Sequence, residues 1–258
     1  MQFKWIFFCL ILFSFFKVQA QNDEEYVESY KNTKKPIFSK DLYEYKNLDY
    51  TSYFVSPTAF TITKRDFRIA GNDFIFYKLT YGLTGKTNVS INTSLFGSII
   101  GSIKHSFDVR ENNRFALSAS FGDFTAALKD TSIWFGGADA VYTIGNHENN
   151  MSFGTGFYSI KTNLELLHRN KLFYFHCLTF GIQRQIAKKT FLMAEGYYFT
   201  NYSIFTGAGG LKFIIKSKYA LNIGVMPILW NNIRQNRYSP KPFVIPVVSL
   251  RMLIERRD

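Results

Sequence analysis

One short run in the sequence has the residue types of a phosphate-binding loop. Gly85-Lys86-Thr87 matches the end of such a loop, which holds phosphate with backbone N–H groups and a lysine. The full pattern needs a glycine where this chain has Thr80. It also needs a helix behind the loop, whereas the residues that follow alternate as a strand does. We therefore interpret the run as a hairpin turn.

The histidines do not form a catalytic or metal-binding pattern. His105, His147, His168 and His176 lack a metal-ligand spacing such as HExxH. A lipase could use His105 and Ser106 as a pair, but adjacent strand residues point to opposite faces of a sheet. We therefore predict no catalytic residue, no metal site and no cofactor, in a protein that is not an enzyme.

Charged residues recur at alternate positions of the predicted strands. Eight of them are expected on the inner, polar face: Lys78, Lys104, Asp108, Arg110, Asp139, Glu195, Lys212 and Arg251. Charged side chains at membrane depth usually face water or one another. We predict that these residues line the lumen of a barrel, and two interpretations stay open. They form an ion-paired network that plugs and rigidifies the barrel, or a weakly anion-selective pore lining.

The stretch Asp73–Phe96 shows the kind of element that would position these charges. Its first arm carries the apolar residues Ile75, Tyr77, Leu79, Tyr81 and Leu83 on one face. The residues between them are mostly small or polar, and the alternation resumes after the turn Thr84–Thr87. A period of two with one apolar face is typical of a β-strand. The stretch is therefore predicted to be a hairpin.

The same unit recurs to the end of the chain. The other predicted strands are Tyr53–Thr63, Ser102–Arg110, Phe115–Gly122, Ile133–Gly145, Met151–Ile160, Leu172–Ile186, Thr190–Phe199, Leu211–Lys216, Ala220–Val225 and Phe243–Leu253. Short polar turns alternate with longer connections such as Lys64–Asn72, Phe96–Gly101, Lys161–Lys171 and Trp230–Lys241. We predict an all-β fold, a closed antiparallel up-and-down transmembrane β-barrel of about 12 strands (range about 10–14). A secreted β-sandwich is the alternative.

Composition agrees with a barrel better than with a helical membrane protein. The 258 residues include 28 Phe and 16 Tyr, which suits a lipid-facing band with aromatic girdles. Mean hydropathy is only -0.08, because every second residue of a barrel strand points into a polar interior. The net charge of +12 is concentrated in turns and loops rather than in a recognition helix, so we expect no nucleic-acid partner.

The N-terminal residues read as an export signal. Lys4 precedes an apolar run from Trp5 to Phe16, and we expect cleavage after Ala20. The expected domains are therefore a signal peptide (1–20), a polar periplasmic extension (21–50) and the barrel (51–258). Cleavage would leave Cys177 as the only cysteine, which excludes an intrachain disulfide framework.

Three runs carry a resemblance to a known family. They are Phe54-Val55-Ser56-Pro57-Thr58-Ala59-Phe60, Tyr81-Gly82-Leu83-Thr84 and the Ala-Glu-Gly-Tyr segment Ala194–Tyr197. With the alternating chain around them, they resemble a family of uncharacterised bacterial outer-membrane β-barrel proteins, from Tyr53 to the C-terminus. The resemblance implies the barrel fold and an outer-membrane location, and no activity.

Three functions are open at this point. The first is a non-enzymatic barrel of a Gram-negative outer membrane, structural or a passive pore for a small solute. The alternatives are an enzyme that modifies outer-leaflet lipids and a surface adhesion or binding barrel that uses its extracellular loops. The expected partners are the lipid bilayer with its lipopolysaccharide, the barrel assembly machinery and a small solute. An open or a filled lumen would separate the pore from the adhesin.

Overall fold

The structure is a computed structural model of the chain that describes residues 50–54, 56–73, 76–95, 97–124, 131–164, 169–215, 218–229 and 243–254. Twelve β-strands occupy these residues: β1 (Phe67–Asn72), β2 (Phe76–Thr84), β3 (Thr87–Ser94), β4 (Ser98–Arg110), β5 (Asn113–Phe124), β6 (Thr131–Gly145), β7 (Asn150–Leu164), β8 (Arg169–Ala187), β9 (Thr190–Phe199), β10 (Ile204–Ile215), β11 (Tyr219–Leu229) and β12 (Phe243–Ile254). None of the described residues forms a helix long and apolar enough to cross a membrane.

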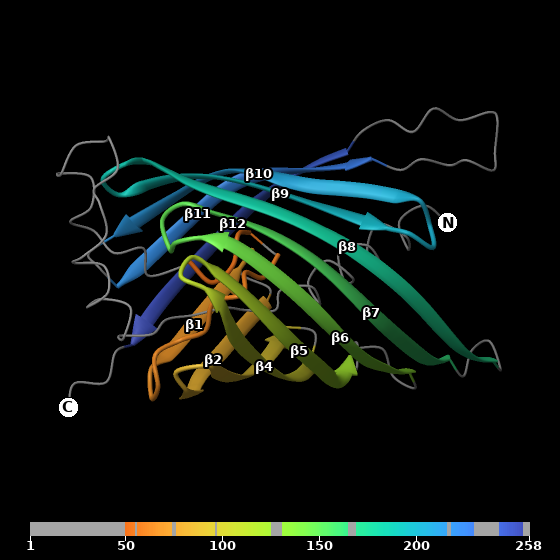
Figure 1. Cartoon of the computed structure of the whole chain (residues 1–258). Helices are drawn as coiled ribbons and strands as arrows, with labels where there is room; N and C mark the ends of the chain where they lie inside the picture. Colours follow the sequence, from red (N-terminus) through yellow and green to blue (C-terminus); the bar gives the residue numbers. More distant parts are fainter. Residues whose placement is uncertain are drawn as a thin grey trace.

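The strands close into one antiparallel barrel (Figure 1). Each strand pairs with its neighbours in sequence, and β1 pairs with β12, with Phe67 opposite Ile254. Closure leaves no sheet edge, so all the backbone groups of the wall can pair with one another. The structure confirms the predicted fold class, an up-and-down barrel of twelve strands.

The two ends of the barrel differ in their connections. We call the end where β1 begins and β12 ends the turn end, because β2–β3, β4–β5 and β8–β9 are joined there by residues 85–86, 111–112 and 188–189. The opposite end, the loop end, includes the connection from β9 to β10 through residues 200–203. The strand β8 is the longest, with 19 residues, and β1 the shortest, with 6.

The wall has an apolar outer face and an inner face that is largely polar near the turn end. In β4 the burial alternates residue by residue from Ser98 to Phe107. Ile99 and Ile103 are exposed at 63% and 49%, whereas Ser102 and Lys104, on either side of Ile103, are buried. The same alternation exposes large apolar side chains around the wall, from Leu79 in β2 to Leu250 in β12. A soluble protein rarely leaves so many large apolar residues in contact with water, whereas a lipid-facing band requires them.

The first predicted strand is wrong. Tyr53–Thr63 is not part of the wall, and β1 instead lies within the predicted loop Lys64–Asn72. Every described residue from Tyr50 to Ile62 is buried, so the segment shows none of the alternation that a barrel strand has. Its β-prone composition fitted a strand, but both of its faces contact protein.

Two other predicted loops are largely strand. Phe96–Gly101 contains the start of β4 at Ser98, and Lys161–Lys171 contains the end of β7 and the start of β8. Glycine and polar residues in these stretches resembled connections, but ladder pairing with a neighbour extends the strands through them. The signal peptide, all of 21–50 but Tyr50, and the predicted loop Trp230–Lys241 lie outside the described residues.

Candidate functional site

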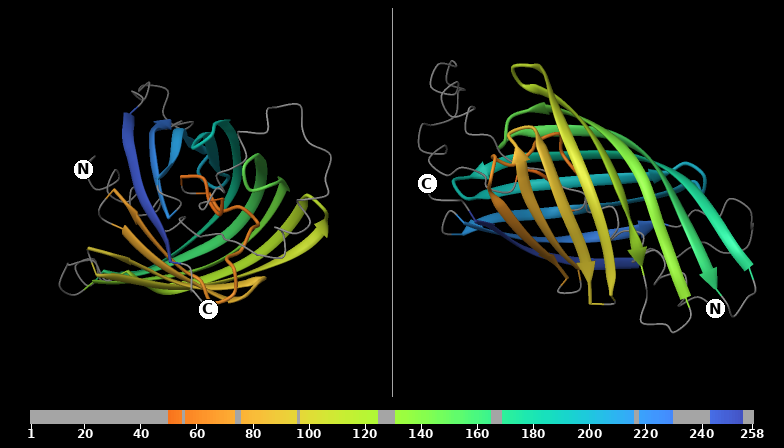
Figure 2. Two further views of the ribbon diagram at one scale, coloured as in Figure 1. Left: turned by 90° about the vertical axis from the view of Figure 1, so that its left-hand side faces the viewer. Right: turned by 90° about the horizontal axis from the view of Figure 1, so that it is seen from below.

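The barrel lumen contains a segment of the chain itself, residues 50–54 and 56–62, which we call the internal segment. The left panel of Figure 2 shows it in orange inside the ring of strands. It turns back on itself, because Tyr53 N donates to Ser56 O at 3.0 Å and Thr58 N donates to Thr51 O at 3.1 Å. A turn of this kind pairs part of the backbone within the segment and leaves the remaining groups for the wall.

Two cations of the wall hold the first part of the internal segment. In β12, Arg251 donates through Nη1 to Ser52 Oγ at 2.6 Å and through Nη2 to Tyr53 O at 2.8 Å. In β10, Lys212 Nζ donates to Gln183 Oε1 at 2.7 Å and to Ser52 O at 3.4 Å. Hydrogen bonds from a charged donor are stronger than those between neutral groups, so these contacts fix the position of the segment in the lumen.

A third cation holds the second part of the segment. In β4, Lys104 Nζ donates to Thr58 O and, at 3.0 Å, to Phe60 O. Two residues along the same strand, Ser106 Oγ donates to Ala59 O at 2.6 Å. Three consecutive carbonyl groups of the segment therefore accept hydrogen bonds from one inward-facing row of β4.

Two N–H groups of the segment contact the other side of the lumen. Ser56 N donates to Glu195 Oε2 of β9 at 2.7 Å, and Ala59 N donates to Thr143 Oγ1 of β6 at 2.7 Å. Carbonyl groups thus meet the cations of β4, β10 and β12, while these N–H groups meet a carboxylate and a hydroxyl across the barrel. The backbone dipoles of the segment are matched to the charges of the wall.

Two aromatic side chains attach the segment near the turn end. Tyr53 Oη donates to Asn150 Oδ1 at 2.7 Å and lies 2.9 Å from Ser152 Oγ, both in β7. Tyr50 stacks on His147, with ring centroids 3.7 Å apart. The segment therefore reaches the connection between β6 and β7 as well as the strands.

Inner-face glycines shape the space that the segment occupies. A Cβ at Gly181 would lie 2.2 Å from the Tyr53 ring, and the three nearest atoms all belong to that ring. A Cβ at Gly224 would lie 2.6 Å from Phe54 Cζ and also 2.6 Å from a backbone oxygen. The absence of a side chain at these two glycines therefore leaves room for the two aromatic rings.

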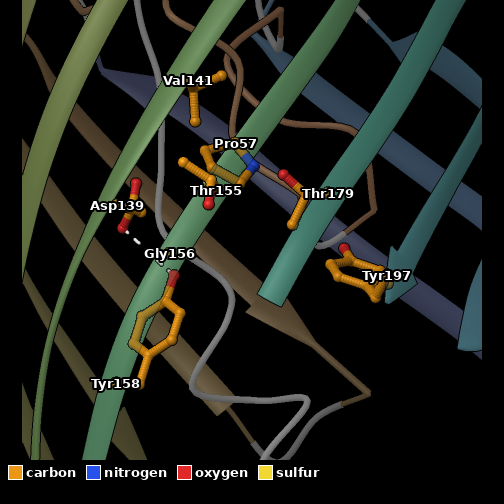
Figure 3. Close-up of a pocket in the computed structure, with 8 residues that line it drawn as sticks. All are labelled: Pro57, Asp139, Val141, Thr155, Gly156, Tyr158, Thr179 and Tyr197. Atoms are coloured by element: carbon orange, nitrogen blue, oxygen red, sulfur yellow. Dashed lines mark hydrogen bonds between the residues drawn. The ribbon is translucent and has the colours of Figure 1, made fainter. Parts of the chain in front are cut away.

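A small cavity lies between the internal segment and β6 to β9 (Figure 3). It is lined by Pro57, Asp139, Val141, Thr155, Gly156, Tyr158, Thr179 and Tyr197. The carboxylate of Asp139 accepts hydrogen bonds from Ser118 Oγ and, at 3.5 Å, from Tyr158 Oη. The wall therefore also holds a buried, hydrogen-bonded carboxylate on β6, two strands away from Lys104.

Aromatic rings cover the inner wall beyond the segment, toward the loop end. Phe135 and Tyr158 have ring centroids 5.8 Å apart, and Tyr158 and Phe175 have centroids 5.4 Å apart, both pairs stacked. Phe199 of β9 continues the row at 6.3 Å from Phe175. These residues belong to the largest buried apolar cluster, which the expectation of a polar inner face did not include.

The structure separates the eight charged residues that the sequence placed on the inner face. Six are buried: Lys78, Lys104, Asp139, Glu195, Lys212 and Arg251. Asp108 and Arg110 are exposed at the turn end of β4, where Asp108 pairs with Lys86 at 2.7 Å and with Arg114 at 3.1 Å. A bulge between Asp108 and Arg110 interrupts the register at that point.

The described histidines have structural contacts, and His168 lies outside the described residues. His176 Nε2 lies 2.6 Å from Thr155 Oγ1 and its Nδ1 lies 3.2 Å from Thr200 Oγ1, which gives both ring nitrogens a partner. His105 Nδ1 lies 2.8 Å from Thr87 Oγ1. Within the described part of the chain, no group of three or more His, Cys, Asp or Glu could hold a metal ion.

No protein-family model and no curated protein matches this sequence. Among solved structures, the KdgM porin in complex with disordered oligogalacturonate has a TM-score of 0.43 and 11% identity, over 72% of this chain and 96% of that one. The NanC porin gives 0.41 and 9%, over 73% and 97%. The Acinetobacter baumannii outer membrane protein Omp33 gives 0.37 and 10%, over 74% and 97%. Similarities this low do not define a function for this chain.

Proposed function

We propose that the protein is an outer-membrane β-barrel without enzymatic activity, a passive pore for small solutes that is closed by its internal segment. The observation that carries this proposal is the division of the wall into two faces. Large apolar side chains cover the outside, and hydrogen-bonding and charged side chains surround the internal segment on the inside. A closed sheet of this kind suits a bilayer and encloses a polar path.

The internal segment explains how such a pore stays closed. It contacts β4, β6, β7, β9, β10 and β12 through hydrogen bonds, so it spans the lumen from one wall to the other. We propose that solutes pass only when this segment moves. A filled lumen also suits an adhesin, but the loops that an adhesin would use lie largely outside the described residues.

The location is tested by fractionation. The full-length protein, expressed in a Gram-negative host, is expected in the outer-membrane fraction and to migrate faster on gels before boiling than after it, as a folded barrel does. Recovery of the mature protein from the soluble periplasm would contradict the proposal.

Passage is tested in liposomes. Vesicles that contain the wild-type protein are expected to swell slowly in a small sugar, and vesicles with a variant that lacks residues 50–62 are expected to swell at least about tenfold faster. Gel mobility before boiling shows whether the variant still folds as a barrel. A folded variant that passes no solute would exclude a pore.

A further inference from the structure

We propose that the internal segment occupies an anion-binding site, and that small multivalent anions compete with it for Lys104, Lys212 and Arg251 and thereby open the barrel. This inference rests on the proposed function and names the chemical class of solute. The anions meant are those with carboxylate or phosphate groups.

The buried charges carried by the strands are segregated by sign. Buried cations lie at Arg68, Lys78, Lys104, Lys212 and Arg251, on β1, β2, β4, β10 and β12. These strands belong to one continuous part of the wall, on both sides of the seam between β12 and β1. The buried carboxylates of the strands, Asp139 and Glu195, lie on β6 and β9, and a third buried carboxylate, Asp66, lies at the turn end just before β1. One side of the lumen is therefore positive, as a site for anionic groups requires.

The internal segment presents oxygen atoms to this positive side. Arg251 contacts the carbonyl oxygens of Tyr53 and Phe54 at 2.8 Å and 3.0 Å, and Lys104 contacts those of Thr58 and Phe60. These are neutral acceptors in the positions where the oxygens of a carboxylate or phosphate would bind. A charged acceptor binds arginine and lysine more strongly than a neutral carbonyl does. A solute with several anionic groups can therefore replace the segment at more than one cation.

The attachment of the segment allows it to leave without opening the wall. Its own backbone contributes no bond to the barrel ladder, since β1 and β12 pair directly with each other. The chain after it is fixed to β2 at the turn end, where Arg65 N donates to Gly82 O at 2.8 Å and Gly82 N donates to Asp66 O at 3.0 Å. The segment can therefore swing toward the turn end about residues 63–66 while the barrel stays closed.

The experiment uses the full chain in planar bilayers, with inorganic phosphate and tripolyphosphate as probes. At constant ionic strength, replacing chloride by tripolyphosphate is expected to increase the open-channel fraction at least about tenfold, and sucrose is expected to have no such effect. Phosphate is expected to act in the same direction at higher concentration. If tripolyphosphate is no more effective than chloride, anions do not displace the segment.

Two variants separate the binding site from the segment. Gly181→Ala leaves all cations in place but forces the Tyr53 ring to move, so it is expected to give an open channel that prefers chloride over potassium by at least about threefold. Adding Tyr53→Ala removes the clash and is expected to restore closure. Gly209→Ala is the matched control, because among the described residues its Cβ would meet only Met193 O, at 3.9 Å.

The cations are tested in the open background. Lys104→Met with Arg251→Met, added to Gly181→Ala, is expected to abolish the chloride preference while conductance remains. An equal preference with and without these cations would overturn the anion site. If Gly181→Ala does not fold, the variant that lacks residues 50–62 serves as the open background. If no folded variant conducts any ion, the pore itself is excluded, which is a different failure from conduction without anion preference.

Discussion

Arg251 and Tyr53 lie 198 residues apart in the chain, and the guanidinium of Arg251 donates to the Tyr53 carbonyl at 2.8 Å. The bond joins the last strand of the wall to the segment that fills the lumen. The same guanidinium also contacts Ser52 and Phe54. One side chain of the strand that closes the barrel therefore also holds the internal segment in place.

Replacing this side chain should loosen the segment. Arg251→Met keeps the aliphatic part and removes the donors, and we expect a loss of about 3 kcal/mol in unfolding free energy because buried carbonyls lose charged partners. Urea titration in lipid vesicles measures the loss, and limited proteolysis from the turn end reports release of the segment. Arg110→Met is the control, since Arg110 is exposed. Equal stability of the two variants would contradict the role of Arg251.

Glu195 should stabilise the fold by accepting a hydrogen bond from the internal segment. Glu195→Gln retains an oxygen for Ser56 N–H and should change the unfolding free energy little, whereas Glu195→Leu leaves that N–H without this acceptor and should cost about 2 kcal/mol. The measurement is the midpoint of thermal loss of the fast-migrating gel form. The prediction fails if glutamine and leucine have the same effect.

The apolar outer face predicts that an arginine placed on it lowers stability by an amount that depends on its depth in the membrane. Ile103 lies near the middle of β4, and Ile103→Arg should destabilise the protein by about 2–4 kcal/mol in vesicles. Leu83 is the last residue but one of β2, and Leu83→Arg should cost only about 0–1 kcal/mol. Both side chains are 49% exposed, so a soluble protein would tolerate the two substitutions equally. Urea unfolding in vesicles distinguishes these outcomes.

Asp108 and Arg110, both exposed at the turn end, should not affect ion selectivity. Asp108→Asn and Arg110→Gln are expected to leave the reversal potential of an open channel unchanged, because both residues lie outside the filled part of the lumen. The reversal potential in a potassium chloride gradient measures this. A shift in reversal potential as large as that caused by Lys104→Met would show that Asp108 and Arg110 line the pore after all.

Local alternation was enough to predict most of the wall. The hairpin Asp73–Phe96 and the strands around Ile103 and Ile182 show one apolar face, and lipid contact makes that pattern strict in a barrel. The inward position of Lys104 and Lys212 follows from the same alternation, because each lies between two outward-facing neighbours.

The internal segment could not be predicted in this way. Its partners Lys104, Glu195 and Arg251 are distant in the sequence, with separations of 46, 139 and 198 residues. The hydrogen bonds also use backbone atoms that any sequence provides. Aromatic and β-branched residues around Pro57 favour an extended chain both in a wall and in a lumen. The small residues that accommodate it, such as Gly181, were visible but equally consistent with curvature of the sheet.

The location of Arg251 on β12 sets an order of events during biogenesis. Translation produces the internal segment before any strand and β12 after all the others. The segment can therefore gain its guanidinium partner only after the final strand has been synthesised. The contact between Arg251 and the internal segment is consequently among the last that a newly made chain can form.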